Sequence, residues 1–266
     1  MQKWFIYILL LLIIIILFEY KLIEKESENF DVKVKNEIPL NIFQTWYTKK
    51  LPYYMQKNVD LLREQNPQFK YHLYDDNDCR DFIDKYFDDT VLNAYDRLVP
   101  GAYKADLWRY CVLYIHGGVY LDIKMRCVGD FRLIEIVDKE HYVKDMQSIS
   151  IEPHSFGIYN AVMIQKKKNP FLMECIQQVV KNVNDNVYGF SPLYPTGPGM
   201  LGDLYSKYKY DYRLPDMDMY LVEHVNIVYK ERMILEHYPE YRKEQLNTQK
   251  DSHYSVLWNE QSIYLL

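Results

Sequence analysis

One stretch, "PGAYKADLWRYCVLYIHGGVYLDIK" at residues 100–124, constrains the fold of this chain more than any other. Four apolar side chains in it recur at helical spacing and form one stripe that must pack inward: Leu107, Tyr110, Cys111 and Tyr114. Pro100 suits the first turn of such a helix, and the glycines at 117 and 118 suit its end. Because β-forming residues follow at once, the stretch predicts a helix that leads directly into a strand.

The segments around this helix alternate between strand and helix patterns. A mostly buried strand is expected at 38–43, an amphipathic helix at 51–67, an alternating strand at 69–76 and a short helix at 77–87. Downstream, "SFGIYNAVMIQ" reads as a strand and "NPFLMECIQQVVKNV" as an amphipathic helix, and the pattern weakens after "DLYSKYKYDYRLPDMDMYLVE". This rhythm predicts a mixed α/β domain built around a largely parallel sheet.

The amino terminus has a different character. "WFIYILLLLIIIILF", from Trp4 to Phe18, is uncharged and apolar, and as a helix it would reach about 22 Å. The hydrocarbon core of a bilayer is ~30 Å thick, and flanking lysines extend the reach of a short span. No small-x-small cleavage site follows, so an uncleaved anchor is favoured over a signal peptide or a buried soluble helix. We expect one transmembrane anchor at 1–20, a charged stem at 21–36 and one domain at 37–266.

Charge and cysteine content exclude some classes of protein. The 266 residues have a formal net charge of −5 and no long basic run, which argues against a nucleic-acid partner. The four cysteines lack C-x-x-C spacing, so neither a zinc site nor a disulfide framework is expected. The 27 tyrosines suit half-buried strands and carbohydrate-facing clefts equally well.

Two charged residues share one face of the predicted helix. Asp106 and Arg109 are three residues apart, on a side away from the apolar stripe. Taken alone, this spacing favours a surface ion pair, which contributes only a few tenths of a kcal/mol.

The predicted strand at 117–127 adds a second pair. Strict alternation places Asp122 and Lys124 on one face of it. In a D-x-D sequence two carboxylates would lie there, about 7 Å apart, and share a metal-bound nucleotide sugar. Here an ammonium replaces the second carboxylate. Three readings stay open: Lys124 offsets diphosphate charge itself, Asp122 binds a metal with a residue from elsewhere, or the face is merely solvated.

A true D-x-D does occur at Asp216 and Asp218. It follows Pro215 in a weakly patterned region, without a glycine turn or a strand leading into it. We therefore expect this second motif not to be the sugar site.

Several motifs in order resemble those of one known family: "IPLNIFQTW", "AYKADLWRYCVLYIHGGVYLDIK", "IYNAVMIQKKKNPFL", "TGPGM" and "HYSVLW". From about residue 38 to 258 the chain resembles the glycosyltransferases with a sugar-binding region containing a DXD motif. That family includes initiating and ceramide mannosyltransferases and capsule transferases. The resemblance implies a GT-A fold, a Rossmann-like, mostly parallel mixed sheet flanked by helices, with the nucleotide sugar at the carboxyl ends of the strands.

The resemblance also implies roles for particular residues. Trp46 corresponds to the residue beside the nucleotide base, and Asp106 with Arg109 to the pair that holds the donor sugar's hydroxyls. Asp122 matches the first motif aspartate, which contacts ribose, sugar or metal. Lys124 stands where the usual metal-binding aspartate is found, which puts the implied Mn²⁺ or Mg²⁺ in question.

Further positions follow from the same resemblance. His253 and Trp258 match a carboxy-terminal element beside the diphosphate, so His253 is a candidate metal ligand together with Asp122. Thr196 and Gly197 match a loop that borders the cleft.

The function expected from these residues is transfer of a hexose from a nucleoside-diphosphate sugar to a hydroxyl of a glycan or lipid, with retention of configuration. The resemblance implies catalytic roles for Asp106, Arg109 and Asp122. The alternative is a membrane-tethered, degenerate transferase that binds a sugar nucleotide or a partner without turnover. An internal membrane of Golgi or ER type is expected, and the lysines on both sides of the apolar run leave its orientation open.

Overall fold

The computed structural model describes residues 37–146, 156–248 and 252–265. They belong to one compact unit, Glu37–Leu266. The predicted anchor at 1–20 and stem at 21–36 lie outside the described residues. Within the described ranges, no helix has both the length and the apolar character needed to cross a membrane.

The first sheet has four strands in the order β2-β1-β3-β6. The central strand β1 (Asn41–Thr45) runs parallel to β2 (Lys70–Tyr74) and to β3 (Gly118–Leu121). The edge strand β6 (Val162–Gln165) is antiparallel to β3. Parallel neighbours require helical crossovers, which the helices between these strands supply. The prediction of a mixed α/β domain flanked by helices is confirmed.

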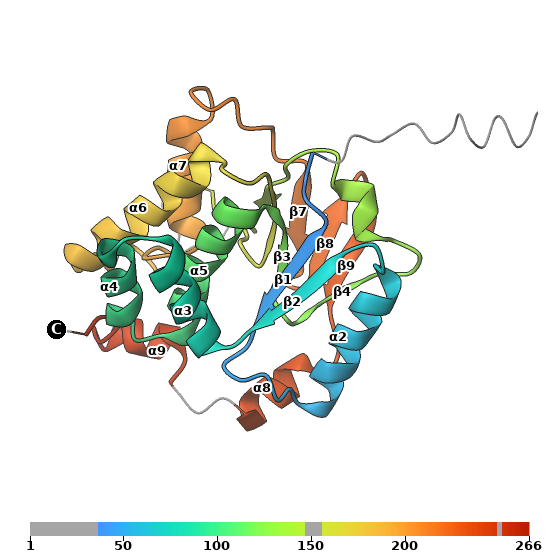
Figure 1. Cartoon of the computed structure of the whole chain (residues 1–266), viewed down its shortest axis with the longest axis horizontal. Helices are drawn as coiled ribbons and strands as arrows, with labels where there is room; N and C mark the ends of the chain where they lie inside the picture. Colours follow the sequence, from blue (N-terminus) through green and yellow to red (C-terminus); the bar gives the residue numbers. More distant parts are fainter. Residues whose placement is uncertain (1–36, 147–155, 249–251, 266) are drawn as a thin grey trace, which may run out of the picture. The chain divides into compact units, whose positions relative to one another are not determined.

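The helices form two groups around this sheet (Figure 1). They are α2 (Tyr53–Gln65), α3 (Asp76–Tyr86), α4 (Asp89–Arg97), α5 (Gly101–His116), α6 (Pro170–Asn184), α7 (Pro198–Tyr208), α8 (Tyr241–Thr248) and α9 (Tyr254–Asn259). Helices α3–α7 and α9 gather on one side of the sheet, where Phe43 and Tyr120 join a core with Trp108 of α5. The sequence analysis missed α4, which begins with a cap by Asp88.

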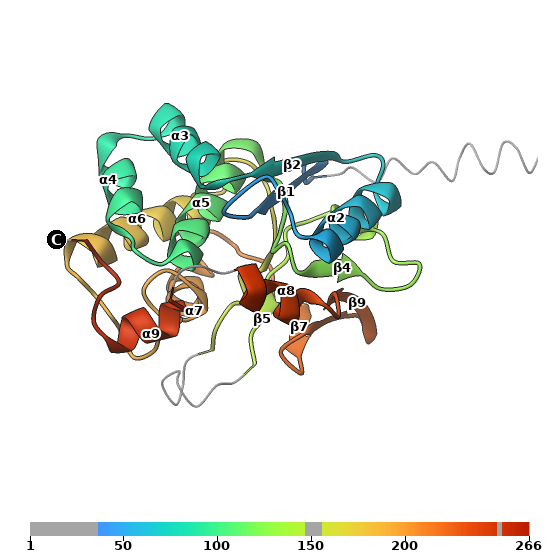
Figure 2. The same ribbon diagram turned by 90° about the horizontal axis from the view of Figure 1, so that it is seen from below.

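A second sheet covers the other face of the first, and the sequence did not predict it. Its order is β4 (Met125–Cys127), β9 (Arg232–His237), β8 (Asn226–Tyr229), β7 (Met219–Val222) and β5 (Val143–Lys144), and only β5–β7 is a parallel pair. Figure 1 places helices α3–α6 to the left of β1 and β7–β9 to its right, and in Figure 2 β7 and β9 lie below β1. Ile42 and Val119 of the first sheet share a buried core with Ile227 and Leu235 of the second. The expected single sheet is therefore one half of a two-sheet core.

Two glycines end α5 in the way the sequence predicted. Gly117 has φ +62° and Gly118 φ +130°, values that side chains disfavour. A Cβ at Gly117 would lie 2.5 Å from the backbone nitrogen of Lys167, and one at Gly118 would lie 2.7 Å from the carbonyl of Asn41. At both positions the neighbouring backbone therefore leaves no room for a residue with a Cβ.

The predicted strand at 117–127 is wrong in its middle. Strand β3 ends at Leu121, and the chain then turns, with the Met125 amide donating to the Asp122 carbonyl at 2.9 Å. Strand β4 begins at Met125 but belongs to the second sheet. The alternation fails here because the chain crosses from one sheet to the other, and we call residues 122–124 the crossing turn.

Candidate functional site

The ion pair on α5 is buried, so the expectation of a surface pair is wrong. Asp106 is 8% exposed and Arg109 is 5% exposed. Arg109 Nη2 lies 3.1 Å from Asp106 Oδ1. The guanidinium also donates to the carbonyl of Asn160 at 2.8 Å. The segment before β6 therefore covers the helix face that spacing alone assigned to solvent.

The Asp106 carboxylate is held entirely by protein groups. Asn160 Nδ2 donates to Oδ1 at 2.9 Å, and the Thr196 hydroxyl donates to Oδ2 at 2.6 Å. Gly197 follows, and a Cβ at that position would lie 3.3 Å from the same Oδ2. Burial raises the pKa of Asp106 despite the opposing effect of Arg109. The structure thus brings the predicted loop residues Thr196 and Gly197 to the buried acid.

The second carboxylate lies beyond the carboxyl end of β3. Asp122 Oδ1 accepts a hydrogen bond from the Tyr120 hydroxyl at 2.8 Å and lies 3.5 Å from Arg109 Nη1. Asp122 Oδ2 lies 2.6 Å from Lys124 Nζ. Arg109 stacks over the Tyr120 ring at 4.4 Å, a favourable cation–π geometry. Asp106, Arg109, Asp122 and Lys124 therefore form one continuous set, which we call the charged cluster.

The charges of this cluster are mutually stabilised. Burial alone would raise the pKa of Asp122, but Lys124 and Arg109 outweigh it and hold that pKa below its usual value. Burial likewise acts to lower the pKa of Lys124, and the Asp122 carboxylate more than offsets it, so the pKa is raised. Asp122 is therefore an anion and Lys124 a cation at neutral pH.

Aromatic and imidazole groups surround the ammonium of Lys124. Its Nζ lies 5.5 Å from the centre of the Tyr159 ring. The Tyr159 hydroxyl is 3.2 Å from His237 Nε2. Burial first, and then the charge of Lys124, lower the pKa of His237 to about 4, so this imidazole is neutral. Lys124 is thus a cation on this side of the cluster, and the charge of Arg242 also acts on His237.

Trp46 also lies close to the crossing turn. It follows β1, and its indole packs in a small apolar cluster with Met55, Val59 and Ile123, the middle residue of the turn. Its Nε1 is buried and has no hydrogen-bond partner among the described residues. The Gln44 amide donates to the Asp122 carbonyl at 3.3 Å and ties the end of β1 to the turn. The ends of two parallel strands therefore bring Trp46 and Asp122 to the same edge of the sheet.

The carboxy-terminal candidates lie on α9. His253 precedes that helix as its cap, with Nδ1 2.7 Å from the Ser255 hydroxyl. Trp258 Nε1 donates to the carbonyl of Tyr188 at 2.8 Å. Among the described residues neither side chain forms a hydrogen bond or ion pair with Asp122, and their place beside the diphosphate stays a prediction.

A divalent cation, which a D-x-D site implies, does not fit the residues around Asp122. No group of three or more His, Cys, Asp or Glu side chains among the described residues is arranged to hold a metal. The one carboxylate at the turn already faces Lys124 at 2.6 Å and Arg109 at 3.5 Å. Like unit charges about 4 Å apart repel by roughly 4 kcal/mol near a protein surface, and a divalent ion doubles this. The expectation of a metal held by Asp122 and His253 stays a prediction.

The other D-x-D has structural partners. Asp216 pairs with Lys209, and Asp218 lies 2.6 Å from Lys139 and 2.8 Å from His141 Nδ1. The contacts of Asp218 tie the segment before β7 to residues 139–141. None of these partners belongs to the charged cluster.

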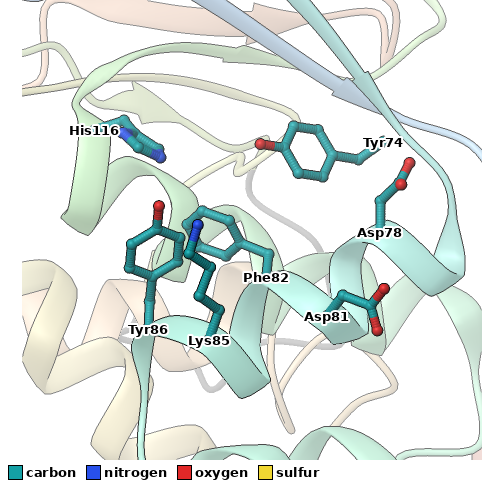
Figure 3. Close-up of a pocket in the computed structure, with 7 residues that line it drawn as sticks. All are labelled: Tyr74, Asp78, Asp81, Phe82, Lys85, Tyr86 and His116. Atoms are coloured by element: carbon teal, nitrogen blue, oxygen red, sulfur yellow. The ribbon is translucent and has the colours of Figure 1, made fainter.

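A hollow of about 240 Å³ lies away from the charged cluster (Figure 3). It is lined by Tyr74, Asp78, Asp81, Phe82, Lys85, Tyr86 and His116. Asp78 is already engaged, because its carboxylate accepts the Asp75 backbone N–H in the capping box of α3 and pairs with Lys49. None of the charged cluster's residues lines this hollow, and we assign it no role.

Sequence reasoning missed two residues that shape the cluster. Tyr120 is two residues before Asp122, and its hydroxyl donates a hydrogen bond to that carboxylate, which the alternation does not predict. Asn160 lies in the stretch read as a strand, and its amide bonds both Asp106 and the Tyr110 hydroxyl. No periodic signal distinguishes a buried amide of this kind.

Comparison with known proteins agrees with the family that the motifs indicate. Residues 52–143 match the family described as "Glycosyltransferase sugar-binding region containing DXD motif". Over 186 residues the chain is 30% identical to inositol phosphoceramide mannosyltransferase 3 of Schizosaccharomyces pombe, covering 68% of this chain and 48% of that protein. Over 157 residues it is 27% identical to the initiation-specific alpha-1,6-mannosyltransferase of Candida albicans, covering 57% of this chain and 35% of that protein. The chain spans about half or less of the length of these relatives.

The solved structure of the PaToxG glycosyltransferase is also similar, with a TM-score of 0.46 and 16% identity, covering 69% of this chain and 77% of that one. The resemblance predicted from the sequence is confirmed by the family match over residues 52–143.

Proposed function

Because residues 52–143 belong to the glycosyltransferase family with a DXD sugar-binding region, we propose that this protein is an enzyme that transfers a hexose. The donor is a nucleoside-diphosphate sugar, and the acceptor is a hydroxyl of a glycan or a lipid. The observation that carries the proposal is the convergence of Asp106, Arg109 and Asp122, with Arg109 within 3.1 Å and 3.5 Å of the two carboxylates.

The position of this convergence in the fold supports a GT-A assignment. Trp46 follows β1 and Asp122 follows β3, two parallel neighbours in the first sheet. In open α/β sheets, ligands bind outside the carboxyl ends of such strands. A Rossmann-like sheet with its donor at this edge is the arrangement that the family resemblance implies.

In the proposed complex, each part of the donor meets a different side chain. Trp46 stacks on the nucleotide base. Arg109 and Asp122 hold the sugar, with Asp106 behind them. Lys124 faces the diphosphate, and His253 and Trp258 of the α9 region are proposed to lie beside it. Cleavage of the anomeric C–O bond leaves negative charge on the diphosphate, so positive groups aimed there lower the barrier.

The relatives' names suggest the substrates. One is named for mannosylation of inositol phosphoceramide and the other for initiation of an alpha-1,6-mannose linkage. We therefore take mannose as the first donor sugar to test, with retention of configuration, and take a lipid or glycan at an internal membrane as the acceptor. Anchoring of the chain by residues 1–20 is part of the same proposal.

The test measures release of nucleoside diphosphate by the full-length chain. GDP-mannose and UDP-hexoses are supplied with inositol phosphoceramide or mannosyl glycan acceptors. We expect acceptor-dependent turnover, and we expect Asp122→Asn to lower kcat/KM by about 100-fold. Lys207→Ala, on the exposed surface of α7, is the matched control and should leave turnover unchanged.

Two outcomes would contradict the proposal. Donor binding without transfer to any acceptor would favour the degenerate, binding-only transferase. Full turnover by Asp122→Asn would show that the charged cluster is not the donor site.

A further inference from the structure

We propose that Lys124 is the resident cation of the donor site, so that the diphosphate binds without a divalent metal. The inference rests on the proposed function and concerns how this chain performs it with Lys124 in the position of the second motif aspartate. It is carried by the geometry of the crossing turn, by the partners of Asp122 and by the chemistry around the lysine.

The crossing turn fixes Lys124 beside Asp122. The Met125 amide closes the turn on the Asp122 carbonyl at 2.9 Å, and the Tyr238 amide donates to the Lys124 carbonyl at 3.0 Å. The Asn58 amide donates to the Ile123 carbonyl at 3.1 Å. Within this turn Lys124 Nζ lies 2.6 Å from Asp122 Oδ2. The ammonium is therefore built into the site rather than left on a mobile surface chain.

Both oxygens of Asp122 are already engaged. Tyr120 and Arg109 contact Oδ1, and Lys124 contacts Oδ2. A metal that displaced Lys124 from Oδ2 would face an ammonium tethered in the same turn. In a D-x-D motif a second carboxylate attracts the metal. In this chain Lys124 occupies the position of that carboxylate.

The surroundings of Lys124 suit an ammonium better than a hard metal ion. Tyr159 presents its ring to Nζ at 5.5 Å, and the neutral His237 lies behind it. Hard cations such as Mg²⁺ prefer carboxylate and carbonyl oxygens, whereas an ammonium is stabilised by aromatic faces and by one anionic partner. Around Lys124 the Tyr159 ring supplies the aromatic face and Asp122 supplies the anionic partner.

The side chain also remains within reach of a ligand. Lys124 is 17% exposed and Asp122 is 23% exposed, against 6% for the side chain of Arg109. An ammonium has three N–H donors, and Asp122 accepts one of them. When the anomeric C–O bond breaks, its electron pair stays on the diphosphate oxygen, and the Lys124 N–H groups stabilise that charge in place of a metal.

The experiment measures binding of GDP and UDP to the full-length chain by calorimetry, in EDTA and in Mn²⁺. We expect the wild-type affinity to agree within about twofold under the two conditions. Lys124→Met keeps the length of the side chain but removes its charge, and should weaken binding about tenfold in both buffers. Lys124→Asp restores a D-x-D, and should bind weakly in EDTA but recover about tenfold or more in Mn²⁺. Lys207→Asp, on α7, is the surface control and should match the wild type.

A second readout does not depend on the nucleotide. The electron paramagnetic resonance signal of free Mn²⁺ should be depleted by Lys124→Asp and not by the wild type. Wild-type nucleotide binding that requires Mn²⁺ would overturn the inference and leave the proposed function standing. Failure of the wild type to bind any nucleotide under either condition would instead refute the proposed function. If Lys124→Asp does not fold, the comparison of wild type with Lys124→Met still decides.

Discussion

The two carboxylates that share Arg109 are held in different ways. Asp106 is buried and is bonded by Asn160 and Thr196, which are distant in sequence from it and from each other. Asp122 is more exposed, and apart from Arg109 its bonds come from residues two positions away on either side. Burial raises the pKa of Asp106, whereas neighbouring cations lower that of Asp122. One acid fastens segments of the fold together, and the other remains partly exposed at the end of β3.

The strongest way to break this comparison is to remove the side chain that joins the two acids. Arg109→Ala leaves two carboxylates without their shared cation and is expected to lower the free energy of unfolding by about 3–5 kcal/mol. Urea unfolding of the full-length chain measures it. Arg80→Ala is the control, because Arg80 pairs with Asp96 on the surface and should cost less than about 1 kcal/mol. Equal losses in both variants would mean that the charged cluster is not a buried unit.

A smaller change separates the task of Asp106 from that of Asp122. Thr196→Val keeps the shape of the side chain but removes the hydroxyl that donates to Asp106 at 2.6 Å. We expect a loss of about 1.5–3 kcal/mol in the free energy of unfolding, because a buried carboxylate loses its donor. Nucleotide affinity should change less than about twofold. Thr90→Val, at an exposed cap, should cost under about 0.5 kcal/mol, and a large loss of affinity in Thr196→Val would contradict the division of tasks.

The smallest expected effect is a difference in pH dependence. The lowered pKa of Asp122 means that its contribution to stability is present above its unfolded pKa and is lost as pH falls through the folded value. The raised pKa of Asp106 has the opposite sign, since stability falls as pH rises from the unfolded pKa to the folded one. Asp122→Asn should therefore reduce the rise in the free energy of unfolding with pH in the acidic range. Asp106→Asn should reduce the fall in the free energy of unfolding with pH in the range above it. Urea unfolding from pH 3 to 8 measures both, and changes of the same sign would refute the distinction.

Helices α2, α3, α5 and α6 were predicted because their signals are local, whereas α4, α7, α8 and α9 were not predicted. The stripe from Leu107 to Tyr114 and the glycines at 117 and 118 fixed α5 closely, since apolar spacing and left-handed backbone are written into adjacent residues. Burial of the opposite face of α5 was not foreseen. It depends on Asn160 and Thr196, whose approach is set by tertiary packing rather than by any pattern near Asp106.

The second sheet was missed for a reason that can be named. Strands β8 and β9 are joined by Lys230 and Glu231, both with positive φ, in a two-residue loop. Such loops usually contain Asn-Gly or Asp-Gly, the dipeptides that predict a β-hairpin from sequence. Burial alternates along β7, but its exposed positions are Tyr220 and Val222, so "MYLV" shows no apolar–polar alternation that would predict a strand.

The crossing turn has a consequence for how this protein can vary. Residues 122–124 connect β3, registered against β1 and β6, to β4, registered against β9. Inserting or deleting one residue would slide β4 along its partner and exchange its inward and outward side chains, while β3 stayed in place. The identity of the third residue is therefore open to replacement, as a lysine in this position illustrates, but the length of the connection is not.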